Sequence, residues 1–134
     1  MYQYCFGGCS KYSLKVHLIF VTKYRKSLFC NKIMNDVLKQ LFFEITSHYN
    51  YNIIQMETDK DHIHILLDYN PNTSVSKIVK QLKQYTTYHI WGKYEKQLSK
   101  IYWKKRVLWS DGYFACSIGQ VSQDVIEKYI LTQG

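Results

Sequence analysis

Two histidines separated by one residue, His62 and His64, are the side chains best suited by type and spacing to metal chemistry. Residues two apart in a β-strand point to the same face, with Cα atoms about 6–7 Å apart, so both imidazoles could approach one ion. Two neutral imidazoles suit a divalent ion, and a hard ion would add oxygen ligands or water. A chance pair of histidines on a half-exposed strand would give the same short pattern.

Near the C-terminus, Tyr129 and Gln133 stand four positions apart in a segment whose pattern predicts a helix. Residues four apart share one face of a helix. A tyrosine hydroxyl can act as a nucleophile and form a covalent intermediate, and the amide oxygen of Gln133 is a candidate third metal ligand. The alternative is that Tyr129 only packs among the apolar residues Val125, Ile126 and Ile130.

The charge balance favours a polyanionic partner. Eighteen Lys and Arg residues against ten Asp and Glu give a net charge of +8, an excess that suits nucleic acid. Thirteen tyrosines accompany these cations, and aromatic rings among cations bind single strands because every base offers a face for stacking. A basic chain would also serve simple solubility, and most of the tyrosines are expected in the core or on a sheet.

The length and composition indicate one folded domain over residues 1–134, with residues 1–10 as a loose N-terminal extension. Hydrophobic residues make up 46% of the 134 positions, enough for a core. No apolar run approaches the roughly 18 residues of a membrane helix, and the N-terminus lacks the features of a signal peptide. We therefore expect a cytoplasmic protein without a membrane partner.

Hydrophobic periodicity predicts an α+β fold of the ferredoxin-like (RRM-like) class. The expected order is β-α-β-β-α-β, with a four- to five-stranded antiparallel sheet and a C-terminal helix that carries Tyr129. In the strand of the two histidines, Ile63, Ile65 and Leu67 would face the helices, so the histidines would lie on the opposite face. The expected elements are strands over 12–22, 51–57, 62–68 and 113–118, and helices over 31–48, from 73 or 74 to about 88 or 91, and over 122–133.

Four motifs follow one another along the chain. His17 to Arg25 reads HLIFVTKYR, Asp61 to Leu67 reads DHIHILL, Trp109 to Phe114 reads WSDGYF, and the tyrosine helix follows. In this order, covering nearly the whole chain, they resemble the HUH-type single-tyrosine transposases of prokaryotic insertion sequences, small enzymes that move elements as single-stranded DNA.

The resemblance implies a reaction and its participants. Tyr129 would attack a phosphodiester of single-stranded DNA at an insertion-sequence end, leaving a 5′-phosphotyrosine link and a free 3′-hydroxyl that later serves in rejoining. His62, His64 and Gln133 would hold Mg²⁺ or Mn²⁺. The family recognises DNA hairpins and acts as a homodimer in which the histidines of one subunit can meet the tyrosine helix of the other, so shared active sites are expected. The alternative is a tyrosine helix that folds back onto its own subunit.

Two basic, aromatic segments, 23–26 and 102–106, are expected to bind this DNA. Their cations would bind phosphates, while Tyr24, Tyr102 and Trp103 would stack on bases. The candidate DNA-binding residues are Lys23, Tyr24, Arg25, Lys26, Lys104, Lys105 and Arg106.

A non-enzymatic RNA- or single-stranded-DNA-binding module of RRM-like fold is the alternative function. However, the K/R-G-F/Y pattern of RNA-recognition domains is absent. His62 and His64 also occupy a strand where stacking aromatic residues would be needed. A binding module would form no covalent link to DNA, which distinguishes the two functions.

Overall fold

Alternating apolar residues place β1 (Leu14–Val21) inside the sheet. The computed structural model describes residues 14–103, 105–116 and 123–133. It pairs β1 antiparallel with β3 (His62–Tyr69) on one side and with β4 (Phe114–Cys116) on the other. β2 (Asn52–Asp59) forms a hairpin with β3, and the strand order is β2-β3-β1-β4. This four-stranded antiparallel sheet confirms the predicted ferredoxin-like arrangement.

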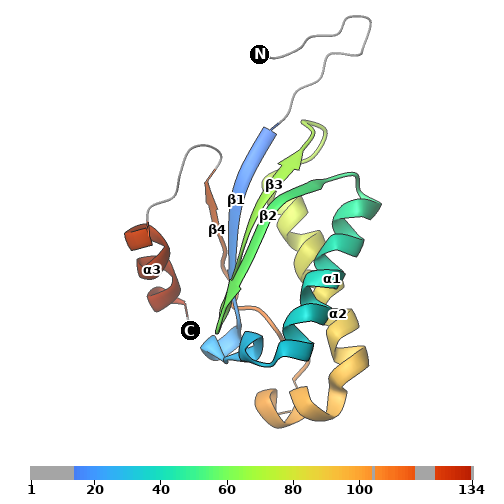
Figure 1. The fold of residues 1–134 in the computed structure, drawn as a ribbon, viewed down its shortest axis with the longest axis vertical. Helices are drawn as coiled ribbons and strands as arrows, with labels where there is room; N and C mark the ends of the chain where they lie inside the picture. The colour runs from blue at the N-terminus through green and yellow to red at the C-terminus, as the bar shows by residue number, and fades with distance from the viewer. Residues whose placement is uncertain (1–13, 104, 117–122, 134) are drawn as a thin grey trace, which may run out of the picture.

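Two helices cover one face of the sheet, as Figure 1 shows. The side chain of Asn31 caps α1 (Lys32–His48) by accepting a hydrogen bond from the Met34 N–H at 3.1 Å. Ser74 caps α2 (Val75–Tyr102) in the same way. The β3 residues that face these helices are fully buried, as their period predicted: Ile63, Ile65 and Leu67.

The second helix is longer than the sequence predicted, because α2 continues to Tyr102 instead of ending near Tyr88 or Trp91. A glycine inside a helix costs about 1 kcal/mol relative to alanine, so Gly92 disfavours continuation of the helix locally. Packing outweighs that cost, since Leu98 and Tyr102 are buried beyond it. The helix is kinked at Tyr94, two residues after Gly92, where φ and ψ are −130° and 40°.

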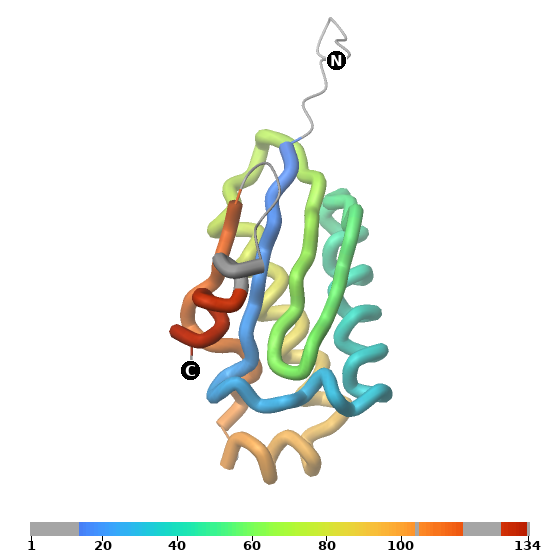
Figure 2. Tube along the Cα trace, turned by 60° about the vertical axis from the view of Figure 1, so that its left-hand side comes forward, coloured from blue at the N-terminus to red at the C-terminus, as the bar shows by residue number. Residues whose placement is uncertain are grey.

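The other face of the sheet carries α3 (Gln123–Thr132), so the fold has three layers (Figure 1). Figure 2 looks onto this face and shows α3 beside β4, with β3 and β2 uncovered by any described helix. Ile19 and Val21 are fully buried here, and Phe114, Tyr129 and Ile130 pack against them. The predicted helix therefore brings its tyrosine onto the face of the histidines.

Several expectations lie outside the described residues: the loose extension over 1–10, residue Lys104, the last two positions of the strand predicted over 113–118, and Ser122 at the start of the last helix. The single domain over 1–134 stays a prediction. Among the residues that the structure describes, no helix is both long and apolar enough to cross a membrane.

Candidate active site

His62 and His64 lie on the sheet face opposite α1 and α2, and both are partly exposed while Ile63 between them is buried. In the β1–β3 register, His62 pairs with Val21 and His64 pairs with Ile19. The Nδ1 atom of His62 lies 3.1 Å from an oxygen of the neighbouring Asp61 carboxylate.

A third histidine, His17 on β1, belongs to this cluster, although sequence reasoning treated it only as a strand residue. Its Nδ1 lies 3.0 Å from Nε2 of His64. Burial lowers the pKa of His64, and nearby His17 lowers it further, against an opposite effect of Glu57. A neutral imidazole is the form that binds a metal ion. The contact depends on the β1–β3 register, which the sequence does not display.

Tyr129 packs its ring 5.8 Å from that of Phe114, centroid to centroid, above Ile19 and Val21. Its hydroxyl oxygen is buried and has no hydrogen-bond partner within the part of the chain that the structure describes. Burial raises the pKa of Tyr129 to about 12. The hydroxyl is therefore protonated at neutral pH, and no described residue accepts a hydrogen bond from it or donates one to it.

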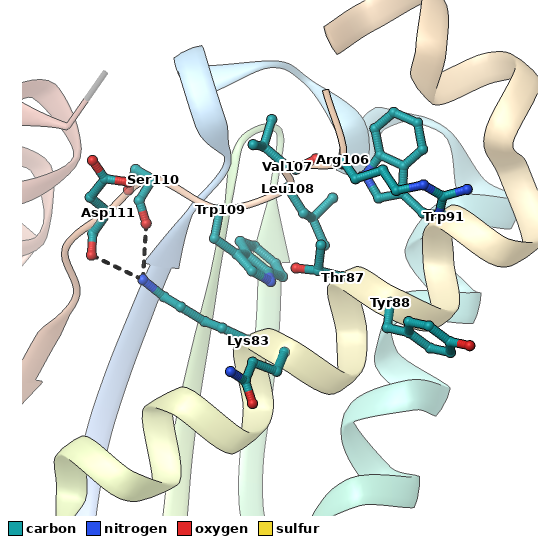
Figure 3. A pocket seen from close by; sticks show the side chains of 11 residues that line it. Lys83, Thr87, Tyr88, Trp91, Arg106, Val107, Leu108, Trp109, Ser110 and Asp111 are labelled. Carbon is teal, nitrogen blue, oxygen red and sulfur yellow. Dashed lines mark hydrogen bonds between the residues drawn. The ribbon is translucent and has the colours of Figure 1, made fainter. Parts of the chain in front are cut away.

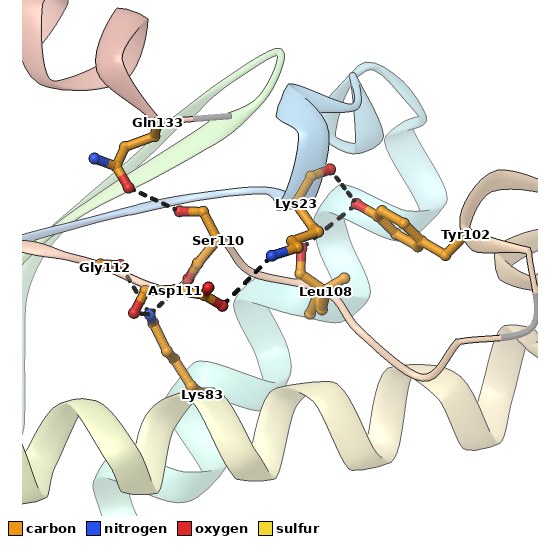
Figure 4. A network of polar contacts seen from close by, with 8 residues as sticks. All are labelled: Lys23, Lys83, Tyr102, Leu108, Ser110, Asp111, Gly112 and Gln133. Atoms are coloured by element: carbon orange, nitrogen blue, oxygen red, sulfur yellow. Dashed lines mark hydrogen bonds and ion pairs between the residues drawn. The ribbon is translucent and has the colours of Figure 1, made fainter.

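Gln133 lies beside Tyr129 at the end of α3. A Cβ atom added to Gly112 would lie 3.3 Å from Oε1 of Gln133 and 3.8 Å from the Tyr129 hydroxyl, so the glycine permits both side chains to approach the backbone. The Gln133 Oε1 also lies 3.4 Å from the Ser110 hydroxyl, which donates to it (Figure 4).

Lys83 of α2 fixes the segment on which Gln133 and Tyr129 rest. Its Nζ donates to the carbonyl oxygens of Ser110 at 2.9 Å and Gly112 at 2.8 Å, with a longer contact to that of Asp111 (Figure 4). Figure 3 shows the contacts with Ser110 and Asp111 from the side of the pocket. The pKa of the Lys83 ammonium group is lowered, mainly because the group is partly buried. A partly buried cation therefore holds the turn by charge-assisted hydrogen bonds.

The predicted site residues thus fall into two neighbouring groups. His62 and His64 stand on β3, whereas Tyr129 rests on Ile19 and Val21, the cross-strand partners of those histidines in β1. Within the described residues, no three His, Cys, Asp or Glu side chains are grouped so that they could hold a metal ion.

The two predicted DNA-binding segments meet at the end of β1. Thr22 pairs with Trp109 in an isolated bridge, and the Lys23 N–H donates to the Leu108 carbonyl at 2.8 Å. Figure 4 shows the ion pair, 3.4 Å long, between Lys23 and Asp111 that joins the same segments. The exposed candidates brought to this end are Tyr24, Arg25, Lys26, Lys105 and Arg106.

Tyr24 and Arg25 adopt left-handed backbone conformations, with φ of 59° and 51°. Each such non-glycine residue costs roughly 1–3 kcal/mol, a strain that occurs at functional sites. The turn is held by the Thr22 hydroxyl, which donates to the Lys26 carbonyl at 2.7 Å. Tyr24 is left 53% exposed, so its ring is accessible for stacking.

Tyr102 corrects one expectation of the sequence. It was expected to stack on bases together with Trp103, but it is 1% exposed and donates a hydrogen bond to the Lys23 carbonyl at 3.1 Å. Tyr102 therefore supports the turn that contains Tyr24, and the ring centroids of the two tyrosines are 6.3 Å apart. Trp103, at 84% exposure, remains free to contact a ligand.

A pocket of about 590 Å³ lies between α2 and the segment from Arg106 to Asp111 (Figure 3). Its walls include Tyr88, Trp91 and Arg106, whose guanidinium lies 5.5 Å from the Trp91 ring centroid. None of the predicted metal or nucleophile residues lines it. The chemistry predicted from the sequence therefore belongs to the open sheet face and not to this cavity.

Comparison with known proteins identifies the class. Residues 10–133 match the family described as "Transposase IS200 like", and the chain therefore belongs to this family. It is a DNA transposase, an enzyme that cleaves and rejoins DNA. Family membership sets aside the non-enzymatic binding module that the sequence left open.

Individual relatives agree with this assignment. The chain is 30% identical over 122 residues to the ISDra2 transposase TnpA of Deinococcus radiodurans, covering 91% of this chain and 85% of that one. It is 27% identical to the transposase for insertion sequence element IS200 of Salmonella typhimurium, over 92% and 79% of the two chains.

Solved structures share the fold. A crystal structure from Deinococcus radiodurans R1, of a protein assigned as a transposase, matches with a TM-score of 0.83 and 25% identity over 95% of both chains. A REP-associated tyrosine transposase bound to a REP hairpin matches with a TM-score of 0.57 and 11% identity, over 97% of this chain and 68% of that one. The second likeness concerns the fold alone.

Proposed function

We propose that this transposase cuts and rejoins single-stranded DNA at insertion-sequence ends through a covalent 5′-phosphotyrosine at Tyr129. The Tyr129 oxygen attacks the phosphorus, the bond from phosphorus to O3′ breaks, and the phenol proton passes to the leaving 3′-oxygen. A 3′-hydroxyl later attacks the same phosphorus and releases Tyr129. The number of phosphoester bonds is conserved in each step, so no nucleotide cofactor is needed.

One observation carries the proposal: the Tyr129 hydroxyl is buried and has no hydrogen-bond partner among the residues that the structure describes, on the sheet face where His62 and His64 lie. A buried hydroxyl left unpaired costs free energy. Such a group is expected where the protein positions it for a substrate that completes its surroundings. Here the substrate would be the scissile phosphate.

The side chains on this face fit a divalent ion, Mg²⁺ or Mn²⁺. His62 and His64 would supply two neutral nitrogens, and Gln133 would supply an amide oxygen from the turn beside Tyr129. Water and DNA oxygens would complete the ligands that hard ions prefer. When bound, the ion would polarise the phosphate and stabilise charge during the attack. The protein itself orients the Tyr129 oxygen through Phe114 and the Gly112 turn.

The basic end of the sheet is the proposed DNA-binding surface. Arg25, Lys26, Lys105 and Arg106 would contact phosphates and Tyr24 would stack on a base, on the same side of the molecule as the turn before His62. We extend the proposal to DNA with hairpin ends, because the motifs resemble those of hairpin-recognising transposases. The REP-associated transposase that shares the fold is bound to a hairpin.

We also propose that the enzyme works as a homodimer with shared active sites, as the resemblance implies. In the single chain, α3 rests on its own sheet through Tyr129 and Ile130. A helix of ten residues is marginal by itself, so it could equally rest on a partner's sheet. Mixing Tyr129→Phe and His64→Ala chains, each inactive alone, restores cleavage only if one subunit's tyrosine meets the other's histidines. No recovery in demonstrated heterodimers would refute sharing.

The function is tested by incubating the protein with labelled single-stranded DNA from an element end and Mn²⁺, then separating the products on a denaturing gel. We expect cleavage together with a protein-linked DNA species, both lost in EDTA and in the Tyr129→Phe variant. Tyr88→Phe, which changes an exposed tyrosine of α2, is the matched control and retains activity. Cleavage by Tyr129→Phe would remove Tyr129 as the nucleophile.

A further inference from the structure

His17 and His64 meet across neighbouring strands on the open face of the sheet. His64 pairs with Ile19 in the β1–β3 register, so His17, two residues before Ile19, is its diagonal neighbour on the same face. Nδ1 of His17 and Nε2 of His64 are 3.0 Å apart, the ring centroids are 5.2 Å apart, and the ring planes are inclined by 34°.

These two distances distinguish a hydrogen bond from a pair of ligands on one ion. The centroid separation exceeds the nitrogen separation by 2.2 Å, which is about two ring radii, so the rings face one another head-on. Two imidazoles on a common ion would instead converge at an angle, which brings the centroids closer for the same nitrogen separation. The His17–His64 contact is therefore an N–H···N hydrogen bond of ordinary length.

The direction of this hydrogen bond decides whether His64 can bind a metal. A neutral imidazole carries its proton on one nitrogen and a lone pair on the other. If His17 donates, the proton of His64 is on Nδ1 and its only lone pair is already used. If His64 donates through Nε2–H, its Nδ1 lone pair is available to an ion while the hydrogen bond is kept.

His62 has the opposite arrangement. An ionised carboxylate only accepts hydrogen bonds, so the 3.1 Å contact with Asp61 requires a proton on Nδ1 of His62. The lone pair of His62 is then on Nε2. Partners that fix the tautomer of a metal-binding histidine in this way are a general feature of metal sites.

We propose that His17 is a positioning residue that holds His64 as the Nε2–H tautomer, so that His64 binds the catalytic metal through Nδ1 and His62 binds it through Nε2. The inference rests on the proposed metal site and adds to it a residue, a hydrogen-bond direction and a choice of nitrogen for each ligand.

Two substitutions separate the hydrogen bond from the bulk of the ring. His17→Asn places an amide oxygen near the position of Nδ1 and can still accept from His64. His17→Phe keeps a ring but removes the acceptor. His48→Phe, at the end of α1 in the opposite layer of the fold, is the control for losing an exposed histidine.

The first measurement is long-range ¹H–¹⁵N NMR of the metal-free full chain at neutral pH. We expect His64 as the Nε2–H tautomer and His62 as the Nδ1–H tautomer, with a mixture at His64 in His17→Phe and the wild-type tautomer restored in His17→Asn. A wild-type His64 protonated on Nδ1 would overturn the inference, whatever the enzyme's activity.

The second measurement is Mn²⁺ affinity, followed by electron paramagnetic resonance. Loss of a partner that orients a metal-binding histidine typically weakens binding about 10- to 100-fold, and we expect that loss in His17→Phe but not in His17→Asn or His48→Phe. Wild-type affinity in His17→Phe, with binding still lost in His62→Ala, would overturn the role of His17 alone. Unchanged binding in both His62→Ala and His64→Ala would instead overturn the proposed metal site.

Discussion

Replacing Tyr129 by phenylalanine should make the protein more stable while it removes the proposed nucleophile. The change deletes one oxygen, which is buried and has no hydrogen-bond partner among the described residues, and keeps the ring that packs against Phe114. Burial removes water from the Tyr129 hydroxyl, and the same loss of water raises its pKa to about 12. Removing the oxygen relieves that desolvation.

The expected gain is modest. A buried donor left unsatisfied costs about 1–3 kcal/mol, and the side chain of Tyr129 as a whole is only half-buried. We therefore expect the lower end, about 1 kcal/mol, which for a domain of this size corresponds to roughly 3–5 °C in Tm. A stabilising change at a residue needed for activity is the usual conflict between stability and function.

Chemical and thermal denaturation of the metal-free protein, followed by circular dichroism, measures this difference. Tyr88→Phe, on a side chain that is 71% exposed, should alter stability by less than about 0.5 kcal/mol. If Tyr129→Phe were instead less stable than the wild type by about 1 kcal/mol, the hydroxyl would have a partner in the native protein. The reasoning from its isolation would then be refuted.

Three further expectations concern catalysis and binding. His64→Ala should abolish cleavage but leave DNA binding nearly unchanged in a gel-shift assay, because the proposed DNA-binding surface is the basic end of the sheet; equal loss of binding and cleavage would contradict this. Gln133→Ala should have a milder effect on cleavage, since water can replace one amide oxygen. DNA affinity should fall steeply with salt as counterions are released, and Lys105→Ala should weaken binding where Lys39→Ala on α1 does not. Because burial raises the pKa of Tyr129 to about 12, the reactive phenolate increases with pH, so single-turnover cleavage should rise by up to about tenfold per unit from pH 7 to 9; a flat profile would show that loss of this proton does not limit the reaction.

The sequence was sufficient for features that depend on local periodicity. The alternation of His62, Ile63 and His64 placed the histidines on the face away from the helices, because side chains in a strand alternate. The helix starts predicted at Asn31 and at Thr73 or Ser74 agree with the structure, in which the side chains of Asn31 and Ser74 accept hydrogen bonds from the first free N–H groups.

Features that depend on tertiary contact could not be predicted in this way. The length of α2 is set by burial of Leu98 and Tyr102, which local propensity does not include. The contact of His17 with His64 requires the strand register. The sequence shows Lys83 only as a cation within a predicted helix, whereas in the structure its Nζ donates to the backbone carbonyls of Ser110 and Gly112 in the turn beside Gln133.

Mapping the covalent link between protein and DNA tests the central claim most directly. The protein is incubated with a single-stranded substrate and Mn²⁺, digested with protease and nuclease, and its peptides are analysed by tandem mass spectrometry. The proposed function predicts one modified peptide, with a 5′-linked nucleotide phosphate on Tyr129, in the wild type but not in His64→Ala. A nucleotide attached to another residue, such as Tyr113 or Tyr88, or cleavage without any attached nucleotide, would contradict it.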